Sequence, residues 1–207
     1  MARDTQSIVK MSRREGYALH PKAHKALVKR PTPPGQQAAA QRMRSKSSQY
    51  ALQLREKQKV KRLYGLLERQ FAKLMQEASR QKDQASGEVL LQLLERRLDN
   101  TVYRAGFAPS RRAARQLVTH GHFTLNGRRV DIPSIRVKTG DVVVVRASGQ
   151  QNNYFKQLED VSPSPNELPT WLKVNRKKFE LKVSGLPTRA DAEPDIKEQL
   201  IVEYYSR

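Results

Sequence analysis

The positive charge of this chain lies in its first two thirds. Residues 1–87 carry 20 Lys and Arg against 6 Asp and Glu, residues 88–150 carry 11 against 5, and residues 151–207 carry 9 against 9. The chain of 207 residues therefore has a formal net charge of +20. Such a surplus attracts polyanions, so we expect a nucleic acid to meet residues 1–150, while the neutral tail packs internally or against another protein.

The composition excludes several classes of protein. The chain has no cysteine, which rules out disulfides, thiolate nucleophiles, iron–sulfur clusters and cysteine-based zinc sites. No window approaches the roughly 18 apolar residues of a membrane-spanning helix. The start MARDTQSIVK lacks the apolar region of a secretory signal, so we expect a cytoplasmic protein without membrane contact, although basic starts also occur in organelle transit peptides.

Residues 1–47 have the composition of a basic arm. They contain Pro31, Pro33, Pro34 and Gly35 and no sustained apolar period, so we expect an extended segment. A solvated flexible tail and an arm that becomes ordered on RNA have the same sequence signature, and both interpretations stay open at this point.

Residues 48–78 carry an apolar helical face. Apolar side chains recur at steps of three and four residues, which predicts one helical run. They are Val60, Tyr64, Leu67, Phe71, Leu74, Met75 and Ala78.

Five cations crowd the early turns of this helical run, with only Glu56 among them. They are Arg55, Lys57, Lys59, Lys61 and Arg62. Like charges four residues apart repel by about 0.2 to 0.5 kcal/mol per pair. We therefore favour a polyanion that neutralises this face over an ordinary solvated face, which would mix charges of both signs.

Residues 88–121 predict two helices. Leucines four residues apart indicate a helix from about residue 88 to Gly106, and Ser110 can cap a second helix that stops near Gly121. We expect three arginines of the second helix to face outward. They are Arg111, Arg112 and Arg115.

Strands follow these helices. Asn126-Gly127 separates residues 123–125 from residues 128–130, which predicts a hairpin because a type I′ turn needs two positive φ angles. Residues 142–145 form an all-valine run that predicts a buried strand. Near the carboxyl terminus, spacing predicts a helical face that packs back on the first helical region. Its members are Ile196, Leu200, Ile201 and Tyr204.

These residues resemble a known family. Residues 95–143, ERRLDNTVYRAGFAPSRRAARQLVTHGHFTLNGRRVDIPSIRVKTGDVV, are closely similar to the RNA-binding module named after small-subunit ribosomal protein S-four. The bacterial-type S-four family also resembles this chain, in the same order, at SRREG (12–16), QLREKQKVKRLYGLLERQF (53–71), PTWLKV (169–174) and LIVEYYS (200–206). The resemblance spans nearly the whole chain, which is a cysteine-free variant.

The resemblance implies an α+β fold with an inserted module. We expect a helical amino-terminal domain with a basic arm, and an S-four-type module of helices on a small, mainly antiparallel sheet. The expected divisions are an extended arm at 1–47, a helical domain at 48–87 completed by 187–207, and an RNA-binding domain at 88–186 whose core module spans about 97–160.

The resemblance also implies a function without catalysis. Family members are structural constituents of the small ribosomal subunit; they bind the 5′ domain of its ribosomal RNA (rRNA), nucleate subunit assembly and contribute to translational accuracy. Neighbouring ribosomal protein S-five is the implied protein partner. Some members hold zinc through cysteines in the arm, which this chain cannot do, so we expect no metal and no cofactor.

The family motif suggests which residues meet rRNA. Those that match it are Arg13, Arg14, Arg55, Lys57, Lys59, Lys61, Arg62, Arg111, Arg112, Arg115, His120, Asn126, Gly127 and Arg128. A turn role for Gly127 and a helix-end role for His120 are equal alternatives. Arg42, Arg44 and Lys46 correspond to a segment that lines the messenger RNA channel in the family, although its composition here departs from the usual pattern.

Enzymes that carry the same module are the main alternative. Pseudouridine synthases place their catalytic aspartate in an RLD motif, and Arg97-Leu98-Asp99 has the same letters. Here the downstream Thr-Ser-Gly context is missing, so we expect Asp99 to be a helix-surface carboxylate paired with a base. An RNA chaperone that borrows the module and a binder of anionic membranes are further alternatives. His20 and His24 flank Pro21 and make a poor metal pair.

Overall fold

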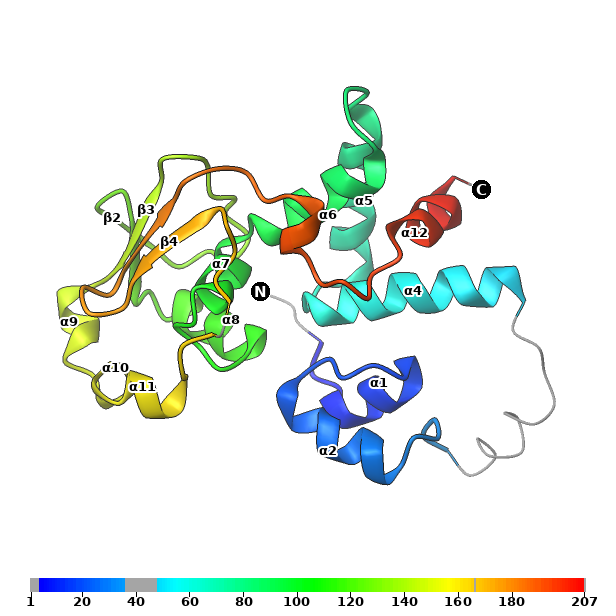
Figure 1. Ribbon diagram of the computed structural model, residues 1–207, viewed down its shortest axis with the longest axis horizontal. Coiled ribbons are helices and arrows are strands. Elements are labelled where there is room, and N and C mark those ends of the chain that lie inside the picture. Colours follow the sequence, from blue (N-terminus) through cyan, green and yellow to red (C-terminus); the bar gives the residue numbers. More distant parts are fainter. Residues whose placement is uncertain (1–3, 36–47, 166, 207) are drawn as a thin grey trace. The chain divides into compact units, whose positions relative to one another are not determined.

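The computed structural model describes residues 4–35, 48–165 and 167–206. The chain has an α+β fold that divides into two compact units, the first formed by residues 1–90 and 195–207 and the second by residues 91–194. The chain passes from the first unit to the second within helix α6 (Ser86–Glu95) and returns just before helix α12 (Glu198–Tyr205). Figure 1 shows these elements along the chain.

The first unit is helical. Its elements are α1 (Ile8–Glu15), α2 (Pro21–Lys29), α4 (Gln49–Leu63), α5 (Glu68–Arg80), the start of α6, and α12. Helix α12 packs along α4, and the rings of Tyr50 and Tyr204 lie 5.8 Å apart between their centroids. Ile201, Val60 and Phe71 are fully buried, so the last helix of the chain shares a core with residues more than 120 positions earlier.

The expectation of an extended arm is wrong for the stretches 8–15 and 21–29, which form α1 and α2. His20 caps α2, because its Nδ1 accepts a hydrogen bond from the Lys22 backbone N–H over 3.0 Å, and Pro21 follows at the first helical position, where its missing N–H costs nothing. Met11, Leu19 and Ala23 are buried. Three buried apolar side chains and a helix cap thus order a segment whose composition is basic.

The expected single helix at 48–78 is two helices, α4 and α5. Helix α4 ends in a Schellman motif, in which the N–H of Leu66 donates to the Lys61 carbonyl over 3.0 Å and that of Gly65 donates to the Arg62 carbonyl over 3.1 Å. Gly65 has φ +66°, a left-handed conformation that glycine adopts without strain. The apolar period continues across this break, which is why spacing alone missed it.

The expected helix from residue 88 to Gly106 is also broken. Helix α6 ends at Glu95 and α7 covers Leu98–Arg104. Between them Arg97 is extended and forms an antiparallel bridge with Arg136; the Leu98 N–H donates to the Ile135 carbonyl over 2.8 Å. Sheet-like bonding with a distant segment therefore overrides the helical period at this point.

The second unit packs helices against a sheet. Its elements after α6 are α7, α8 (Arg111–Thr119), β1 (Phe123–Leu125), β2 (Arg128–Val130), β3 (Val142–Val145), α9 (Ala147–Gln150), α10 (Asn153–Lys156), α11 (Leu158–Val161), β4 (Leu172–Asn175), β5 (Glu180–Val183) and the 3₁₀ turn η1 (Arg189–Asp191). The sheet order is β2-β1-β3-β5-β4, and each strand is antiparallel to its neighbours.

The predicted cap of α8, the hairpin turn and the valine strand are confirmed in this unit. Ser110 caps α8, with its Oγ 3.2 Å from the Ala113 backbone nitrogen. Asn126 and Gly127 have φ +50° and +80°, as the tight turn between β1 and β2 requires. The valine run forms the central strand β3.

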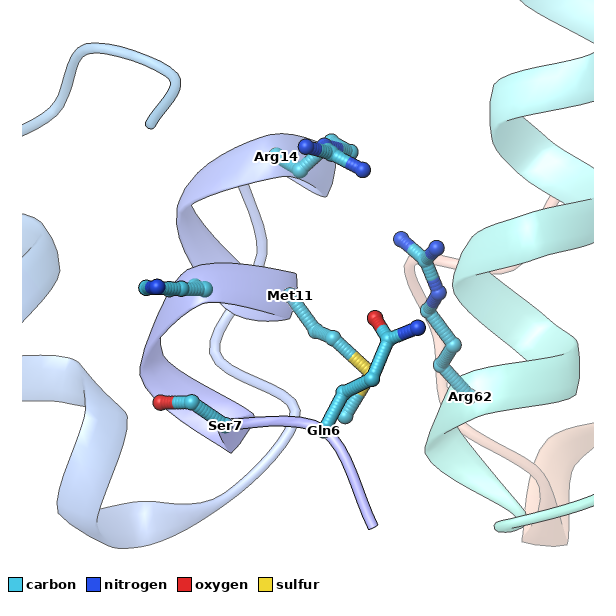
Figure 2. A pocket seen from close by; sticks show the side chains of 6 residues that line it. Gln6, Ser7, Met11, Arg14 and Arg62 are labelled. Atoms are coloured by element: carbon cyan, nitrogen blue, oxygen red, sulfur yellow. The ribbon is translucent and has the colours of Figure 1, made fainter. Parts of the chain in front are cut away.

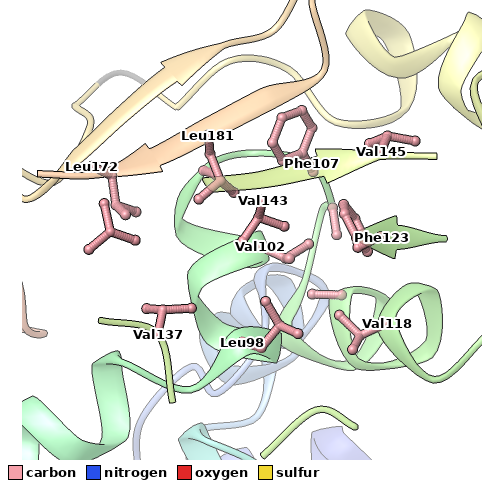
Figure 3. Close-up of a cluster of buried hydrophobic side chains, with 14 of the residues drawn as sticks. Leu98, Val102, Phe107, Val118, Phe123, Val137, Val143, Val145, Leu172 and Leu181 are labelled. Atoms are coloured by element: carbon pink, nitrogen blue, oxygen red, sulfur yellow. The ribbon is translucent and has the colours of Figure 1, made fainter. Parts of the chain in front are cut away.

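One apolar core holds the second unit together. Side chains from α7, α8 and the sheet meet in it, as Figure 3 shows for Leu98, Val118 and Leu181. Trp171 is 2% exposed in the same core, and its carbonyl accepts a hydrogen bond from Ser184 over 2.8 Å. Trp171 therefore anchors the last strands. The helix carrying the predicted arginines is fixed against this core by Ala114 and Val118.

Candidate nucleic-acid interface

The five cations on α4 are held by carboxylates within the first unit. Glu15 pairs with Arg55 and Arg62, and Glu68 pairs with Lys57 at 2.7 Å and Lys61 at 2.9 Å. Lys59 pairs with Glu56 at 2.8 Å and donates to the Asp195 carbonyl over 2.7 Å. The crowding expected from the sequence is therefore relieved inside the fold, by Glu56 within the run and by Glu15 and Glu68 outside it.

These cations differ in how much of them solvent can reach. The Arg55 side chain is 50% exposed, whereas that of Lys57 is 5% exposed. The Lys57 ammonium lies 4.3 Å from the centre of the Tyr204 ring and 5.7 Å from that of Tyr205. Lys57 therefore binds α12 to α4, while Arg55 is available to an external anion.

Glu15 is a buried carboxylate under a positive surface. Its side chain is fully buried, and its Oε2 has no hydrogen-bond partner among the described residues. Burial raises the pKa of Glu15 above its usual value and outweighs the lowering effect of Arg62, Arg55 and Arg14. The carboxylate fixes the Arg62 guanidinium in place.

The neighbouring arginines of α1 have different surroundings. Arg13 donates from Nε to the Thr32 carbonyl over 3.0 Å, so it ties α1 to the segment that follows α2. Arg14 is exposed. Of the two arginines in the SRREG motif, the structure therefore turns one inward and leaves the other at the surface.

The expectation that all three arginines of α8 face outward is wrong for Arg111 and Arg115. Arg111 donates to Asn100 Oδ1 over 2.9 Å and pairs with Glu193 at 3.0 Å. Arg115 donates to Asp99 Oδ2 over 3.2 Å. Arg112 is exposed. The sequence predicted the helix and its cap but not the acids that lie opposite Arg111 and Arg115.

Glu95 is at the centre of this buried network, and sequence reasoning missed it. It is fully buried and receives two hydrogen bonds from Arg104, over 3.0 and 2.8 Å, and one from Asn100 over 2.7 Å. A buried charge needs such partners to offset its loss of hydration. The available signal was its position four residues after Leu91, on the apolar side of the helix.

Glu193, near the carboxyl-terminal end of the second unit, is the last member of this network. It pairs with Arg111 and also lies 3.5 Å from Arg104. Burial would raise the pKa of Glu193, but Arg111 and Arg104 outweigh it and hold the pKa below its usual value. The carboxylate is therefore charged at neutral pH.

Asp99 is paired with bases, as expected, but it is not on the helix surface. It is 5% exposed, and its two oxygens receive hydrogen bonds from Arg97 over 3.2 and 3.0 Å in addition to that from Arg115. Its side chain is thus part of the scaffold that orients α8. This arrangement gives Asp99 a structural explanation without any reaction.

The β1–β2 turn presents both structural and exposed residues. Asn126 donates to Asp141 over 2.8 Å and accepts from the Val142 N–H over 2.9 Å, so it fastens the turn to β3. Arg128 is exposed. Gly127 has φ +80° with open space where a Cβ would stand, which accounts for this glycine by backbone conformation.

A further cation, Arg129, lies beside Gly121 and was not predicted. Its guanidinium is close to Gly121, within 2.7 Å of where a Cβ would be, and His120 ends α8 just before that glycine. Arg146 donates to the Gly121 carbonyl over 3.4 Å. Cations at a helix carboxyl end are favourable. Burial, His120 and Arg146 together lower the pKa of His122 nearby.

The remaining expectations concern messenger RNA contacts, a metal site and a membrane span. Arg42, Arg44 and Lys46 lie outside the described residues. His20 serves as a helix cap. Among the described residues no cluster of three or more His, Asp or Glu side chains suited to a metal ion is found. None of the described helices combines the length and apolarity needed to cross a membrane.

Two family models match consecutive parts of the chain. The "Ribosomal protein S4/S9 N-terminal domain" matches residues 3–95, and the "S4 domain" matches residues 96–143.

Relatives match over the full length. "Small ribosomal subunit protein uS4" of Chloroflexus aurantiacus is 51% identical over 208 residues, and that of Clostridioides difficile is 50% identical over 213 residues. "Small ribosomal subunit protein uS4A" of Symbiobacterium thermophilum is 49% identical over 213 residues. Each alignment covers 100% of both chains.

Proposed function

The chain belongs to the ribosomal protein S4 family, and we propose that it is a structural constituent of the small ribosomal subunit that binds the rRNA of that subunit. The observation that carries this proposal is identity at about half of all positions over the whole of both chains. The relatives bear the names of ribosomal components and not of enzymes. We accordingly propose a cytoplasmic, ribosome-bound protein with no catalytic role.

In the second unit, rRNA phosphates would meet the exposed cations around α8 and the β1–β2 turn. Arg112 and Arg128 are exposed, and the Arg129 guanidinium lies against Gly121, just after the end of α8. Structured RNA is recognised largely through phosphates, 2′-hydroxyls and shape. A fixed set of cations on a rigid unit suits this kind of recognition, because neutralised phosphates release counterions.

Arg111 and Arg115 would support this surface from beneath. Their ion pairs with Glu193 and Asp99 hold α8 in one position. Asn126 and Gly127 would shape the turn that carries Arg128. Preorganisation of this kind lowers the ordering cost of binding, so we assign these residues to positioning and the exposed cations to direct contact.

In the first unit, Arg14 and Arg55 are the most accessible of the predicted contacts. Lys59, Lys61 and Arg62 are largely buried and paired, so they would add positive potential without leaving their carboxylates. Arg13 and Lys57 would act by holding α1 and α12 in place. Pairing inside the unit keeps the basic helix folded before RNA arrives.

The finer functions follow from the family resemblance. We propose that the chain binds the 5′ domain of the rRNA and nucleates assembly there. A protein that binds the folded form of this RNA domain and not its unfolded form stabilises the folded form by linkage. We also propose a contribution to translational accuracy through contact with ribosomal protein S-five. The zero net charge of residues 151–207, with Leu168 and Leu186 exposed, supports a protein partner for this part of the chain.

Contact with messenger RNA is a separate proposal. It concerns Arg42, Arg44 and Lys46 and is supported by their charge and by the family resemblance.

Sedimentation of a cell extract on a sucrose gradient at moderate salt tests the main proposal. We expect one copy of this chain per small-subunit rRNA, retained in the subunit fraction. A chain found mainly at the top of the gradient, or far below stoichiometry, would contradict a structural role and favour a module-bearing enzyme or chaperone. Binding of the purified chain to isolated 5′-domain rRNA tests the finer assignment.

A further inference from the structure

A cavity of about 350 Å³ lies between α1 and α4 in the first unit. It is lined by Gln6, Ser7, Lys10, Met11, Arg14 and Arg62. A single water takes up about 30 Å³ of the liquid, so the space is sufficient for a phosphate group with its ester oxygens. In Figure 2 the guanidinium groups of Arg14 and Arg62 extend toward each other across this space from the two helices.

The polar lining is predominantly cationic. Lys10 and Arg14 come from α1 and Arg62 from α4, which places three positive charges around one space. Among the described residues neither Lys10 nor Arg14 forms an ion pair. The side-chain amide of Gln6 and the hydroxyl of Ser7 add neutral hydrogen-bonding groups to the lining.

The acids near the cavity lie behind its lining. The side chain of Glu15 is fully buried and pairs with Arg62 through Nη1. The other N–H groups of the same guanidinium can therefore donate to an anion in the cavity. Glu15 therefore holds Arg62 in position for an anion rather than occupying the cavity itself. Asp4 accepts a hydrogen bond from the Gln6 backbone N–H over 2.9 Å and is not among the lining residues.

We propose that this cavity binds one backbone phosphate of rRNA, with Arg14, Lys10 and Arg62 as its ligands. This inference rests on the proposed function and deepens it, because it assigns one phosphate to a defined space and adds Lys10 and Gln6 to the contact set. Arg62 forms the fixed wall, since Glu15 anchors it, and the exposed Arg14 and Lys10 close on the phosphate from α1.

The salt dependence of binding to 5′-domain rRNA tests the proposal with the full chain. Arg14→Gln removes one ligand without unpairing Glu15, and we expect the slope of log affinity against log salt to fall by about one. When the salt is raised from roughly 50 to 200 mM, the factor by which the affinity falls should then be about threefold smaller for the variant than for the wild type. Lys173→Gln, an equal charge change at an exposed position on β4, is the matched control and should keep the wild-type slope.

The ¹³C-labelled methyl group of Met11, which lines the cavity, gives a direct readout. We expect its resonance to shift when 5′-domain rRNA is added to the wild type, and to shift less for Arg14→Gln. A shift with inorganic phosphate but none with rRNA would overturn the assignment in favour of a site for the free ion.

The outcomes separate the two proposals. If the wild type binds the rRNA and Arg14→Gln has an unchanged slope, the cavity assignment is wrong and the proposed function stands. If the wild type does not bind the rRNA, both are overturned.

Discussion

Arg115 on α8 donates a hydrogen bond to Asp99 on α7, with 3.2 Å between Nη1 and Oδ2. The same carboxylate is held by Arg97 on its other side. Asp99 thus connects the start of α7 to the middle of α8, and an arginine expected to clamp phosphate is part of the scaffold. The charged residues of this protein therefore divide into those that build the basic surface and those that are exposed on it.

Arg115→Ala and Arg112→Ala should separate these two roles. We expect Arg115→Ala to lower the free energy of unfolding of the second unit by about 2 kcal/mol, because a largely buried, charge-assisted hydrogen bond is lost. Arg112 is exposed, so Arg112→Ala should change that free energy by less than about 0.5 kcal/mol while reducing the salt slope of rRNA binding by about one.

Urea unfolding followed by Trp171 fluorescence provides the stability measurement, because this single tryptophan lies in the core of the second unit. Equal stability of Arg115→Ala and the wild type, or an unchanged salt slope for Arg112→Ala, would refute the corresponding half of this assignment.

Lys57→Met should loosen α12. The ammonium is lost from the face of Tyr204 and from Glu68, and we expect a cost of about 1 to 2 kcal/mol, since half-exposed Glu68 can rehydrate. Burial and the bond to Glu68 raise the pKa of Tyr205, so its hydroxyl remains a donor to that carboxylate. Hydrogen exchange of α12 should accelerate in Lys57→Met and much less in Lys61→Met, which contacts no tyrosine ring among the described residues. Unchanged exchange in Lys57→Met would contradict the role given to this lysine.

Ser110→Ala should destabilise the second unit by about 1 kcal/mol, because Ser110 Oγ satisfies the Ala113 N–H at the start of α8. Ser110→Gly is the matched control and should cost only a few tenths of a kcal/mol, since glycine leaves the first-turn N–H groups accessible to water. Trp171 fluorescence in urea again reports the change. Equal losses for the two variants would show that the hydroxyl contributes through packing and not through the cap.

Features set by neighbouring residues could be predicted from the sequence. Ser110 at the start of α8, Asn126 in the hairpin and the valines of β3 each act through local backbone geometry. Residue spacing likewise placed Ile201 on the face by which α12 packs against α4.

Features set by distant residues could not be predicted in this way. Glu15 neutralises Arg62 from 47 positions away, and Glu193 reaches Arg111 across 82. An exposed cation and a paired one have the same local sequence, so charge alone could propose candidate contacts but could not divide them by role. The interruption of the predicted helix at Arg97 could not be predicted for the same reason, because it depends on pairing with Arg136.

The stability of the first unit should decrease in acid through Glu68. Burial alone would raise the pKa of this carboxyl, but hydrogen bonds from Lys57, Lys61 and Tyr205 lower it from 4.5 to about 2. A folded-state pKa below the unfolded one means that the stabilisation is complete above about pH 4.5 and is lost as the pH falls toward 2. In urea unfolding followed by circular dichroism, the wild type should therefore exceed Glu68→Gln in stability at pH 7, and the difference should shrink between pH 4.5 and 2. Asp83→Asn, which removes one carboxylate at an exposed loop position, is the matched control and should keep the wild-type stability at pH 7. A gap between wild type and Glu68→Gln that stays constant over this range would show that Glu68 acts through its shape and not its charge.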